Sequence, residues 1–186
     1  MRHNSIILFL LILLTGLNVK AQGKKIKFHS INSAGFIIGQ SGTDMMLQSV
    51  NGFAYKNFYS GIGFAKDDYN YNSYPLFFDQ RIYFGKRMNA FAYGDLGYNF
   101  SGKNEPGKEI GYYDTYHFKG GIYTDLGIGF KTKFIKSTSL LFSLGHSYKQ
   151  LQSRVGIELL CIGCQPYFYY YKFGYGRIDL KAGVDF

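Results

Sequence analysis

Residues 173–186 read FGYGRIDLKAGVDF, and this stretch decides the fold. Successive side chains of a β-strand point to opposite faces, so alternate positions share a face. One set of alternate positions is apolar or glycine: Phe186, Val184, Ala182, Leu180, Ile178, Gly176 and Gly174. The other set is mostly charged: Asp185, Gly183, Lys181, Asp179 and Arg177. The segment is therefore predicted to be a strand with one apolar face and one ionic face.

The start of the chain predicts export. A short basic stretch, residues 1–3, precedes an unbroken apolar run over residues 6–14. Residues 19–21, Val-Lys-Ala, are acceptable at the positions before a signal-peptide cleavage site. This is the pattern of a secretory signal peptide, and the run is shorter than the ~20 apolar residues of a spanning helix. We expect residues 1–21 to be a signal peptide that is cleaved off, which leaves residues 22–186 as one domain.

The composition favours a β-protein that is compatible with a membrane. Aromatic residues make up 19% of the chain, with 24 glycines, 3 prolines and no tryptophan. The formal charge is +9, and it falls to +7 when Arg2 and Lys20 leave with the signal peptide. After Leu14 no apolar stretch is long enough for a helical span. A secreted β-protein and a closed barrel remain, since only helices and closed barrels satisfy their backbone polar groups in lipid.

Alternation like that of the C-terminal strand recurs along the chain. It is found in seven further segments: residues 33–41, 45–55, 58–67, 74–85, 90–101, 118–134 and 139–149. The weakest is 45–55, because Met45, Met46 and Leu47 blur its polarity. With the C-terminal strand the count is eight, and an even number of strands of about ten residues is typical of small outer-membrane barrels.

The connections between these segments alternate in length. The tight ones are Lys56–Asn57, Lys86–Asn89 and Ile135–Thr138, and the long polar ones are Asp68–Ser73, Gly102–His117 and Gln150–Lys172. Short periplasmic turns and longer extracellular loops are typical of a barrel with both termini in the periplasm. A secreted β-sandwich would show no such parity. The predicted fold is all-β, an eight-stranded antiparallel up-and-down transmembrane β-barrel.

If the apolar sets face lipid, the other sets fill the interior. These contain ten charged residues: Asp79, Arg81, Asp95, Asp125, Lys131, Lys133, Arg177, Asp179, Lys181 and Asp185. Charges inside a narrow barrel must be paired, because unpaired burial costs several kcal/mol or more. We expect a structural network of salt bridges that plugs the lumen. The alternative is a small pore that conducts protons or ions. We assign no catalytic, cofactor-binding or metal-binding residues.

Two short motifs are candidate chemical sites. His146, Ser147 and Glu158 invite comparison with the outer-membrane lipid A deacylases, but adjacent strand residues point to opposite faces, so His146 and Ser147 are not expected to cooperate. The chain is therefore expected not to be an enzyme. Cys161 and Cys164 suggest a local disulfide in an exported protein, with free thiols as the alternative. A zinc site on this cysteine pair would need two more ligands, and no further His or Cys lies nearby in the sequence to supply them.

Aromatic and basic residues gather near the predicted outer loops. The aromatic groups 112–113 and 167–171, with Tyr116, are expected to form an interfacial girdle, and a sticky surface for glycan or protein is the alternative. The lysines in or near these loops are Lys103, Lys108, Lys119, Lys149 and Lys172. We expect them to meet lipopolysaccharide phosphates. Nucleic-acid binding is not expected.

Several motifs resemble those of small outer-membrane barrels found in Bacteroidota, which are loosely similar to OmpA- and OmpX-type barrels. Ser73–Arg81 resembles a recurring "I/Y-P-L-F-x-D-x-R" strand, while Ala92–Tyr98 and Leu126–Phe130 resemble G-Y and G-x-G-F strand signatures. Phe186 resembles the C-terminal signal that the outer-membrane assembly machinery reads. The resemblance implies this fold in the outer membrane of a Gram-negative bacterium, without a defined activity. We expect a monomer with a structural or surface-interaction role, contacting outer-membrane lipid and lipopolysaccharide, with function concentrated in residues 102–117 and 150–172.

Overall fold

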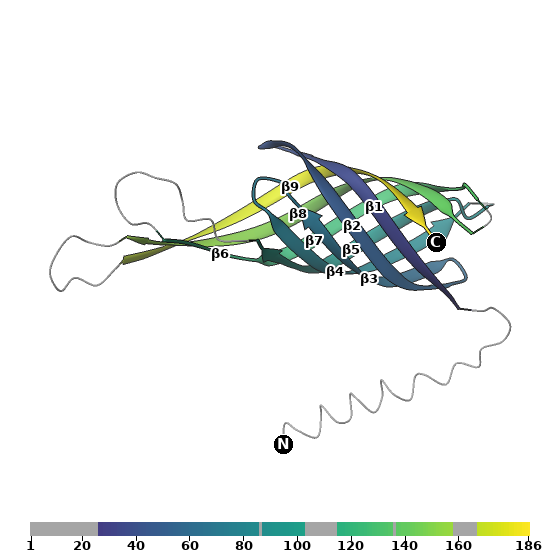
Figure 1. The fold of residues 1–186 in the computed structure, drawn as a ribbon, viewed down its shortest axis with the longest axis horizontal. Helices are drawn as coiled ribbons and strands as arrows, with labels where there is room; N and C mark the ends of the chain where they lie inside the picture. The colour runs from purple at the N-terminus through teal and green to yellow at the C-terminus, as the bar shows by residue number, and fades with distance from the viewer. Residues whose placement is uncertain (1–25, 86, 103–114, 136, 158–166) are drawn as a thin grey trace, which may run out of the picture.

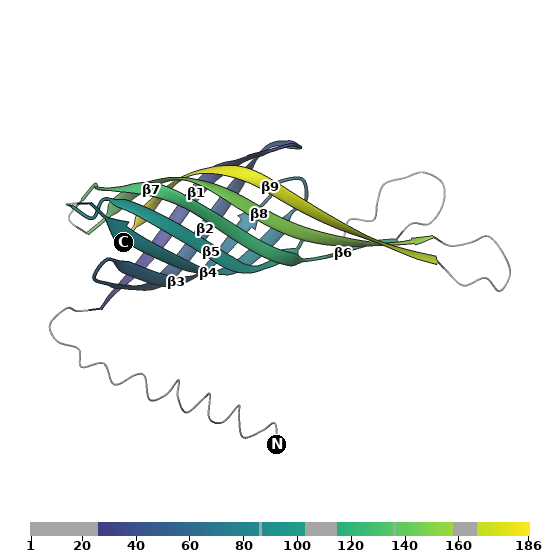
Figure 2. The ribbon, with the colours of Figure 1, turned by 180° about the vertical axis from the view of Figure 1, so that it is seen from behind.

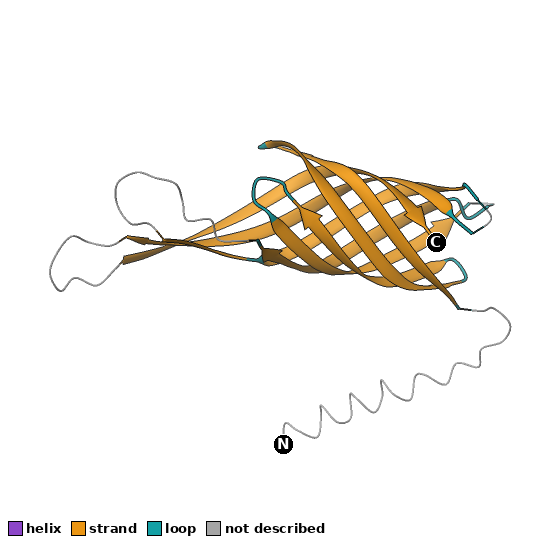
Figure 3. Cartoon of the chain, in the orientation of Figure 1, coloured by secondary structure: helices purple, strands orange, loops and turns teal. Residues whose placement is uncertain are grey.

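The computed structural model describes residues 26–85, 87–102, 115–135, 137–157 and 167–186, and all regular structure there is β-strand (Figure 3). The strands are β1 Lys27–Gly39, β2 Gly42–Tyr55, β3 Phe58–Asp67, β4 Ser73–Phe84, β5 Ala90–Ser101, β6 Thr115–Lys119, β7 Gly121–Lys133, β8 Ser139–Ile157 and β9 Tyr167–Asp185. Within these residues, no helix is long and apolar enough to cross a membrane.

The strands close into a barrel. Each pairs antiparallel with the next in the order β1-β2-β3-β4-β5-β7-β8-β9. β9 then pairs back with β1, from Ile31 opposite Asp185 to Gly39 opposite Arg177. β6 and β7 both pair with β8, and Gly120 alone separates them, so they are two parts of one interrupted strand. The predicted eight-stranded antiparallel barrel is confirmed.

The register fixes the width of the barrel. The register can be followed once around the barrel by stepping from each residue to its partner on the next strand. Starting at Gly39 on β1, the partners are Arg177, Ser147, Asp125, Asp95, Asp79, Gly61, Gly52 and finally His29. The path thus returns to β1 ten residues from its start. With ordinary strand spacings, this stagger implies a tilt of about 40°. Figures 1 and 2 show the slanted strands from opposite sides. An eight-stranded barrel is just wide enough for side chains to fill its interior.

The alternation of the sequence separates the two faces of the wall. Leu126 is 65% exposed, whereas its neighbour Asp125 is fully buried. Large rings fill part of the interior, among them Tyr59, Phe77 and Phe91. Inward glycines make room for these rings. A Cβ on Gly63, for example, would overlap the ring of Phe77, so the size of one residue is matched to that of its partner on the neighbouring strand.

Two strands extend further than the sequence indicates. The segment Gln150–Lys172, expected as a loop, contains a ladder in which residues 150–157 pair with residues 167–174. β6 adds a third strand to this ladder. We call this three-stranded part the extension, and Figure 1 shows that it projects beyond one end of the barrel. The pairing satisfies the backbone polar groups of segments rich in tyrosine, a residue enriched in strands.

The two ends of the barrel differ. The extension leaves one end, which we call the extension end. At the opposite end, the turn end, lie the short connections 56–57, 85–89 and 134–138, together with the start of β1 and the end of β9 (Figure 1). Backbone hydrogen bonds join Phe186 to Ser30 there (3.1 and 3.3 Å).

Substitution of one inward glycine tests this packing. A Cβ on Gly145 would overlap the Tyr93 hydroxyl and lie 2.7 Å from Oδ1 of Asp179 and 2.8 Å from Oδ1 of Asp125. We expect Gly145→Ala to lower the free energy of unfolding, measured by urea titration in lipid vesicles, by about 1–3 kcal/mol because of overpacking.

The matched control is Gly176→Ala, on the outward face of the neighbouring strand. Its Cβ would meet only His146, at an ordinary distance of 3.4 Å from Nε2. A change within about 0.5 kcal/mol is expected there. Equal effects of the two substitutions would contradict the assignment of Gly145 to a filled interior.

Candidate functional site

The charged interior is the candidate site, and the structure buries most of the residues that the sequence singles out for it. Eight are buried: Asp79, Arg81, Asp95, Asp125, Arg177, Asp179, Lys181 and Asp185. Lys131 is partly buried. Lys133 is exposed at the end of β7, so its assignment to the interior is wrong. Its position follows the alternation, but it lies at the rim, where water reaches the side chain.

A central cluster joins β5, β7 and β9. Nζ of Lys181 lies 2.5 Å from Asp125 Oδ2 and 3.1 Å from Asp179 Oδ2. The Tyr93 hydroxyl lies within hydrogen-bond distance of the same two carboxylates, at 3.1 and 3.3 Å. The Lys181 ammonium also sits 4.5 Å from the centroid of the Tyr93 ring. The Lys181 ammonium is therefore the cation shared by the Asp125 and Asp179 carboxylates. The hydroxyl of Tyr93 faces the same carboxylates, and its ring faces the ammonium.

Three carboxylates face one another across neighbouring strands. Asp95 on β5 lies opposite both Asp79 on β4 and Asp125 on β7. Like charges directly opposite in a sheet are destabilising, so each needs a donor. Nε and Nη2 of Arg81 donate to Asp79 (2.8–3.0 Å), and Nε2 of Gln48 donates to Asp95 (3.1 Å). Lys181 provides the donor for Asp125.

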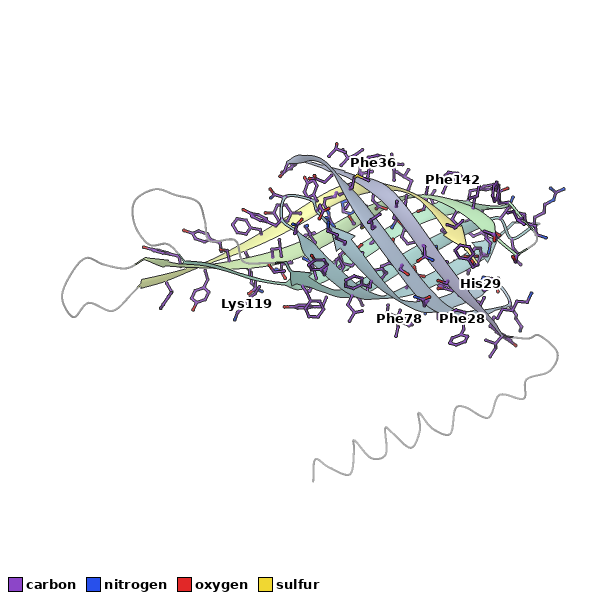
Figure 4. The ribbon with its side chains drawn as sticks, in the orientation of Figure 1. Phe28, His29, Phe36, Phe78, Lys119 and Phe142 are labelled. Carbon is purple, nitrogen blue, oxygen red and sulfur yellow. The ribbon has the colours of Figure 1, made fainter. Side chains whose placement is uncertain are left out.

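A second cluster lies at the turn end. Asp185 binds Lys131 and accepts a hydrogen bond from Nδ1 of His29 (2.7 Å). Nζ of Lys131 also lies 5.4 Å from the centroid of the Tyr83 ring. Figure 4 shows His29 at this end, near the end of β9. The cluster ties β1, β7 and β9 together at the place where the barrel closes.

A third cluster, which we call the polar cap, lies at the extension end and consists of Asp67, Tyr69, Ser73, Lys149 and Arg177. Asp67 binds both Arg177 and Lys149, the latter with an Nζ–Oδ1 distance of 3.0 Å. All three side chains are essentially inaccessible to solvent. Since β3 and β8 are on opposite walls in the strand order, the pair between Asp67 and Lys149 spans the barrel.

The polar cap also fixes the connection between β3 and β4. Nζ of Lys149 donates to the backbone carbonyls of Tyr69 (2.7 Å) and Tyr71 (3.1 Å) and to Oγ of Ser73 (3.1 Å). The Tyr69 amide donates to Asp67 (2.9 Å), and the Tyr69 hydroxyl accepts from the Ser41 amide (2.8 Å). Tyr69 is therefore buried although it lies in a connection between strands.

Two main members of the polar cap were not assigned to the interior by sequence reasoning. Lys149 was expected to meet lipopolysaccharide phosphates, and this is wrong because its side chain is buried against Asp67. The sequence does contain a signal for the inward position of Lys149. If the alternation of Ser143, Gly145 and Ser147 is extended by one step, Lys149 becomes an inward residue. Asp67 likewise continues the inward set of β3.

The remaining predicted features fall in different places. His146 is exposed and Ser147 is buried, so the two side chains are on opposite faces of β8. Lys119 and Lys172 are exposed on the extension, and Phe186 is exposed at the turn end. Several predictions concern residues outside those that the structure describes: the signal peptide 1–21, the pair Cys161 and Cys164, Glu158, Tyr112, Tyr113, Lys103 and Lys108.

The aromatic group 167–171 is part of β9, where alternation sends neighbouring rings to opposite faces. Tyr170 and Tyr171 are 74% and 48% exposed. Tyr171 shares a face with Phe173 and Tyr175, and the three rings follow one another with centroids 6.3 and 6.5 Å apart. This face continues the inward face of the barrel. Only the alternate rings, such as Tyr170, therefore lie on the side of the apolar outer wall.

The positive charges of the interior are held by carboxylates and ring faces. Arg81, for example, lies 5.5–5.8 Å from the ring centroids of Tyr59, Phe91 and Tyr93. Among the described residues, no group of three or more His, Cys, Asp or Glu side chains is arranged to hold a metal ion.

Substitution of two neighbouring aspartates tests how much the polar cap contributes to stability. We expect Asp67→Asn to lower the free energy of unfolding by about 3–5 kcal/mol, because Lys149 and Arg177 lose their buried counter-charge. Asp68→Asn removes only the exposed pair with Lys66 (3.0 Å) and is expected to cost about 1 kcal/mol or less. Urea titration in vesicles measures both. A small loss for Asp67→Asn would contradict the structural weight given to the cap.

Comparison with known proteins concerns the fold. No protein-family model matches the sequence, and no curated protein matches it. The solid-state NMR structure of outer membrane protein AlkL in DMPC lipid bilayers is similar, with a TM-score of 0.51, 11% identity, and coverage of 90% of this chain and 93% of that chain. The translocator domain of autotransporter NalP from Neisseria meningitidis matches with a TM-score of 0.25 and 12% identity, covering 98% and 95%. The likeness to AlkL shows that this chain shares its closed barrel fold with an outer membrane protein.

Proposed function

We propose that this chain is an outer-membrane β-barrel with a structural or surface-interaction role in the envelope of a Gram-negative bacterium. The observation that carries the proposal is the apolar outer wall. Phe36, Phe78 and Phe142, from three parts of the wall, are each more than half exposed and point outward in Figure 4. A soluble monomer rarely exposes a continuous apolar surface of this kind, whereas a barrel in lipid requires one.

A plugged lumen is the second part of the proposal. Buried ion pairs occupy the turn end, the centre and the extension end, and Tyr69 with the polar cap fills the last of these. The cavity between Gln48, Arg81, Tyr93 and Lys181 has a volume of about 10 Å³, which is room for about one water molecule. A continuous path for ions has little space in such an interior.

The extension is the part of the protein that we propose makes the surface interactions. Three paired strands project beyond the barrel, and β9 carries exposed tyrosines there, such as Tyr170 and Tyr171. Exposed aromatic side chains are common at recognition surfaces. Lipid and lipopolysaccharide are the proposed surroundings, with export before insertion, and the protein is proposed to be a monomer. An enzymatic role is not proposed, since His146 and Ser147 lie on opposite faces.

Planar-bilayer recordings test the plug. We expect purified protein to insert without discrete conductance steps, because side chains fill the interior. A porin in the same bilayers is the positive control, and vesicle flotation after a carbonate wash verifies insertion. Reproducible conductance steps that scale with the amount of protein would overturn the plugged lumen in favour of a small pore.

Removal of the extension tests its role. Replacing residues 152–172 by an Asn-Gly turn leaves the β8–β9 ladder intact up to Leu151 opposite Phe173. The shortened barrel is expected to fold, as judged by its heat-modifiable electrophoretic mobility, while cells lose adhesion to glycan- and protein-coated surfaces. Sensitivity to detergent reports on envelope integrity in the same cells. Unchanged adhesion together with unchanged integrity would refute a role for the extension.

A further inference from the structure

The turn end carries a ring of exposed cations, which we call the basic collar: Lys27, Lys56, Arg87 and Lys133. Lys27 begins β1, and Lys133 ends β7. Lys56 lies in the β2–β3 turn, and Arg87 lies in the β4–β5 connection. In the strand order these positions follow one another at intervals of about two strands. The cations are thus spread around the rim rather than gathered on one side.

Each member of the basic collar lies within three residues, along the chain, of an exposed aromatic side chain. Lys27 precedes Phe28 and Lys133 precedes Phe134, with the two rings 59% and 64% exposed. Nζ of Lys56 lies 5.2 Å from the ring centroid of Tyr55. Arg87 follows Phe84, which is also exposed, by three residues.

Exposed rings at the end of an apolar wall mark the boundary between hydrocarbon and headgroups. Lys27 and Lys133 have the inward parity of their strands and lie at the rim beside this boundary. Long cationic side chains at such a rim reach the headgroup layer with their charges. The basic collar is therefore at the level of the lipid phosphates.

The acidic residues leave the collar without counter-charges. Six of the eight described aspartate side chains are buried inside the barrel: Asp67, Asp79, Asp95, Asp125, Asp179 and Asp185. The other two, Asp44 and Asp68, belong to the extension end, where β2 begins and β3 ends. Among the residues that the structure describes, no carboxylate forms an ion pair with a member of the collar.

We propose that the basic collar binds the phosphate groups of anionic phospholipid headgroups in the leaflet at the turn end. This inference rests on the proposed location in a membrane. Four cations around one rim attract an anionic lipid surface from every side, so they favour one depth and one direction of the barrel in the bilayer. The two rims thereby differ in function, since the extension end carries the polar cap and the extension.

Titration with a defined lipid tests the collar. Mature protein in neutral detergent micelles is titrated with phosphatidylglycerol and, separately, with phosphatidylcholine, and bound lipid is counted by native mass spectrometry. The test variant combines Lys27→Gln, Lys56→Asn, Arg87→Gln and Lys133→Gln; asparagine suits position 56, where φ is +57°. The matched control combines Lys66→Gln, Lys119→Gln and Lys172→Gln, which remove exposed cations far from the turn end.

We expect wild-type protein to prefer phosphatidylglycerol. The collar variant should lose about tenfold or more in apparent affinity, and the control variant less than about twofold. The preference should weaken as salt is raised. No preference in the wild type, an equal loss in both variants, or full competition by inorganic phosphate at the same concentration as the lipid would overturn the proposal.

Insertion is measured separately for every variant, by flotation with neutral phosphatidylcholine vesicles and by heat-modifiable mobility. Failure of wild-type protein to insert would contradict the proposed function itself. Normal insertion without a preference for phosphatidylglycerol would contradict the collar alone.

Discussion

The pairing of β9 with β1 is the contact on which the rest of the structure depends. It turns a sheet with two open edges into a wall without edges, so every strand has a partner on both sides over the length of the barrel. It also divides the residues of every strand into an inner and an outer set. Without this seam, neither burial of the charges nor exposure of the apolar residues would follow from the alternation.

Closure makes the inner charges depend on one another. Asp67 reaches Lys149 and Arg177 from another wall, Asp125 shares Lys181 with Asp179, and Asp185 joins strands at the seam. Buried ion pairs contribute little net stability over well-packed apolar residues, but an unmatched partner is costly. We therefore interpret the network as selecting one register of the eight strands, because a slip would separate charges that must meet.

Much of the fold could be predicted from the sequence, because an apolar outer wall and a filled polar interior impose a strict period of two. All eight strands have the predicted order, and even the blurred segment 45–55 forms β2. The period of two separates inward from outward positions, as buried Asp125 beside exposed Leu126 illustrates. It does not give the position of a residue along the barrel: Lys133 reaches water at the rim, and Lys149 lies deeper than its place near a predicted loop suggests.

The extension and the polar cap depend on contacts between segments far apart in the chain, and such contacts leave no local pattern in a single sequence. Residues 150–157 include Gln150, Gln152, Ser153 and Arg154, and residues 167–174 are rich in tyrosine, so both resemble a loop. They pair because β8 and β9 are already aligned by the barrel. Lys149 is bound by backbone carbonyls of a connection on the opposite side. Because those acceptors are main-chain atoms, an inserted or deleted residue would move the carbonyls away from the ammonium. Asn70 has a φ of +60°, which asparagine and glycine adopt more readily than other residues. The connection is thus constrained both in length and at position 70.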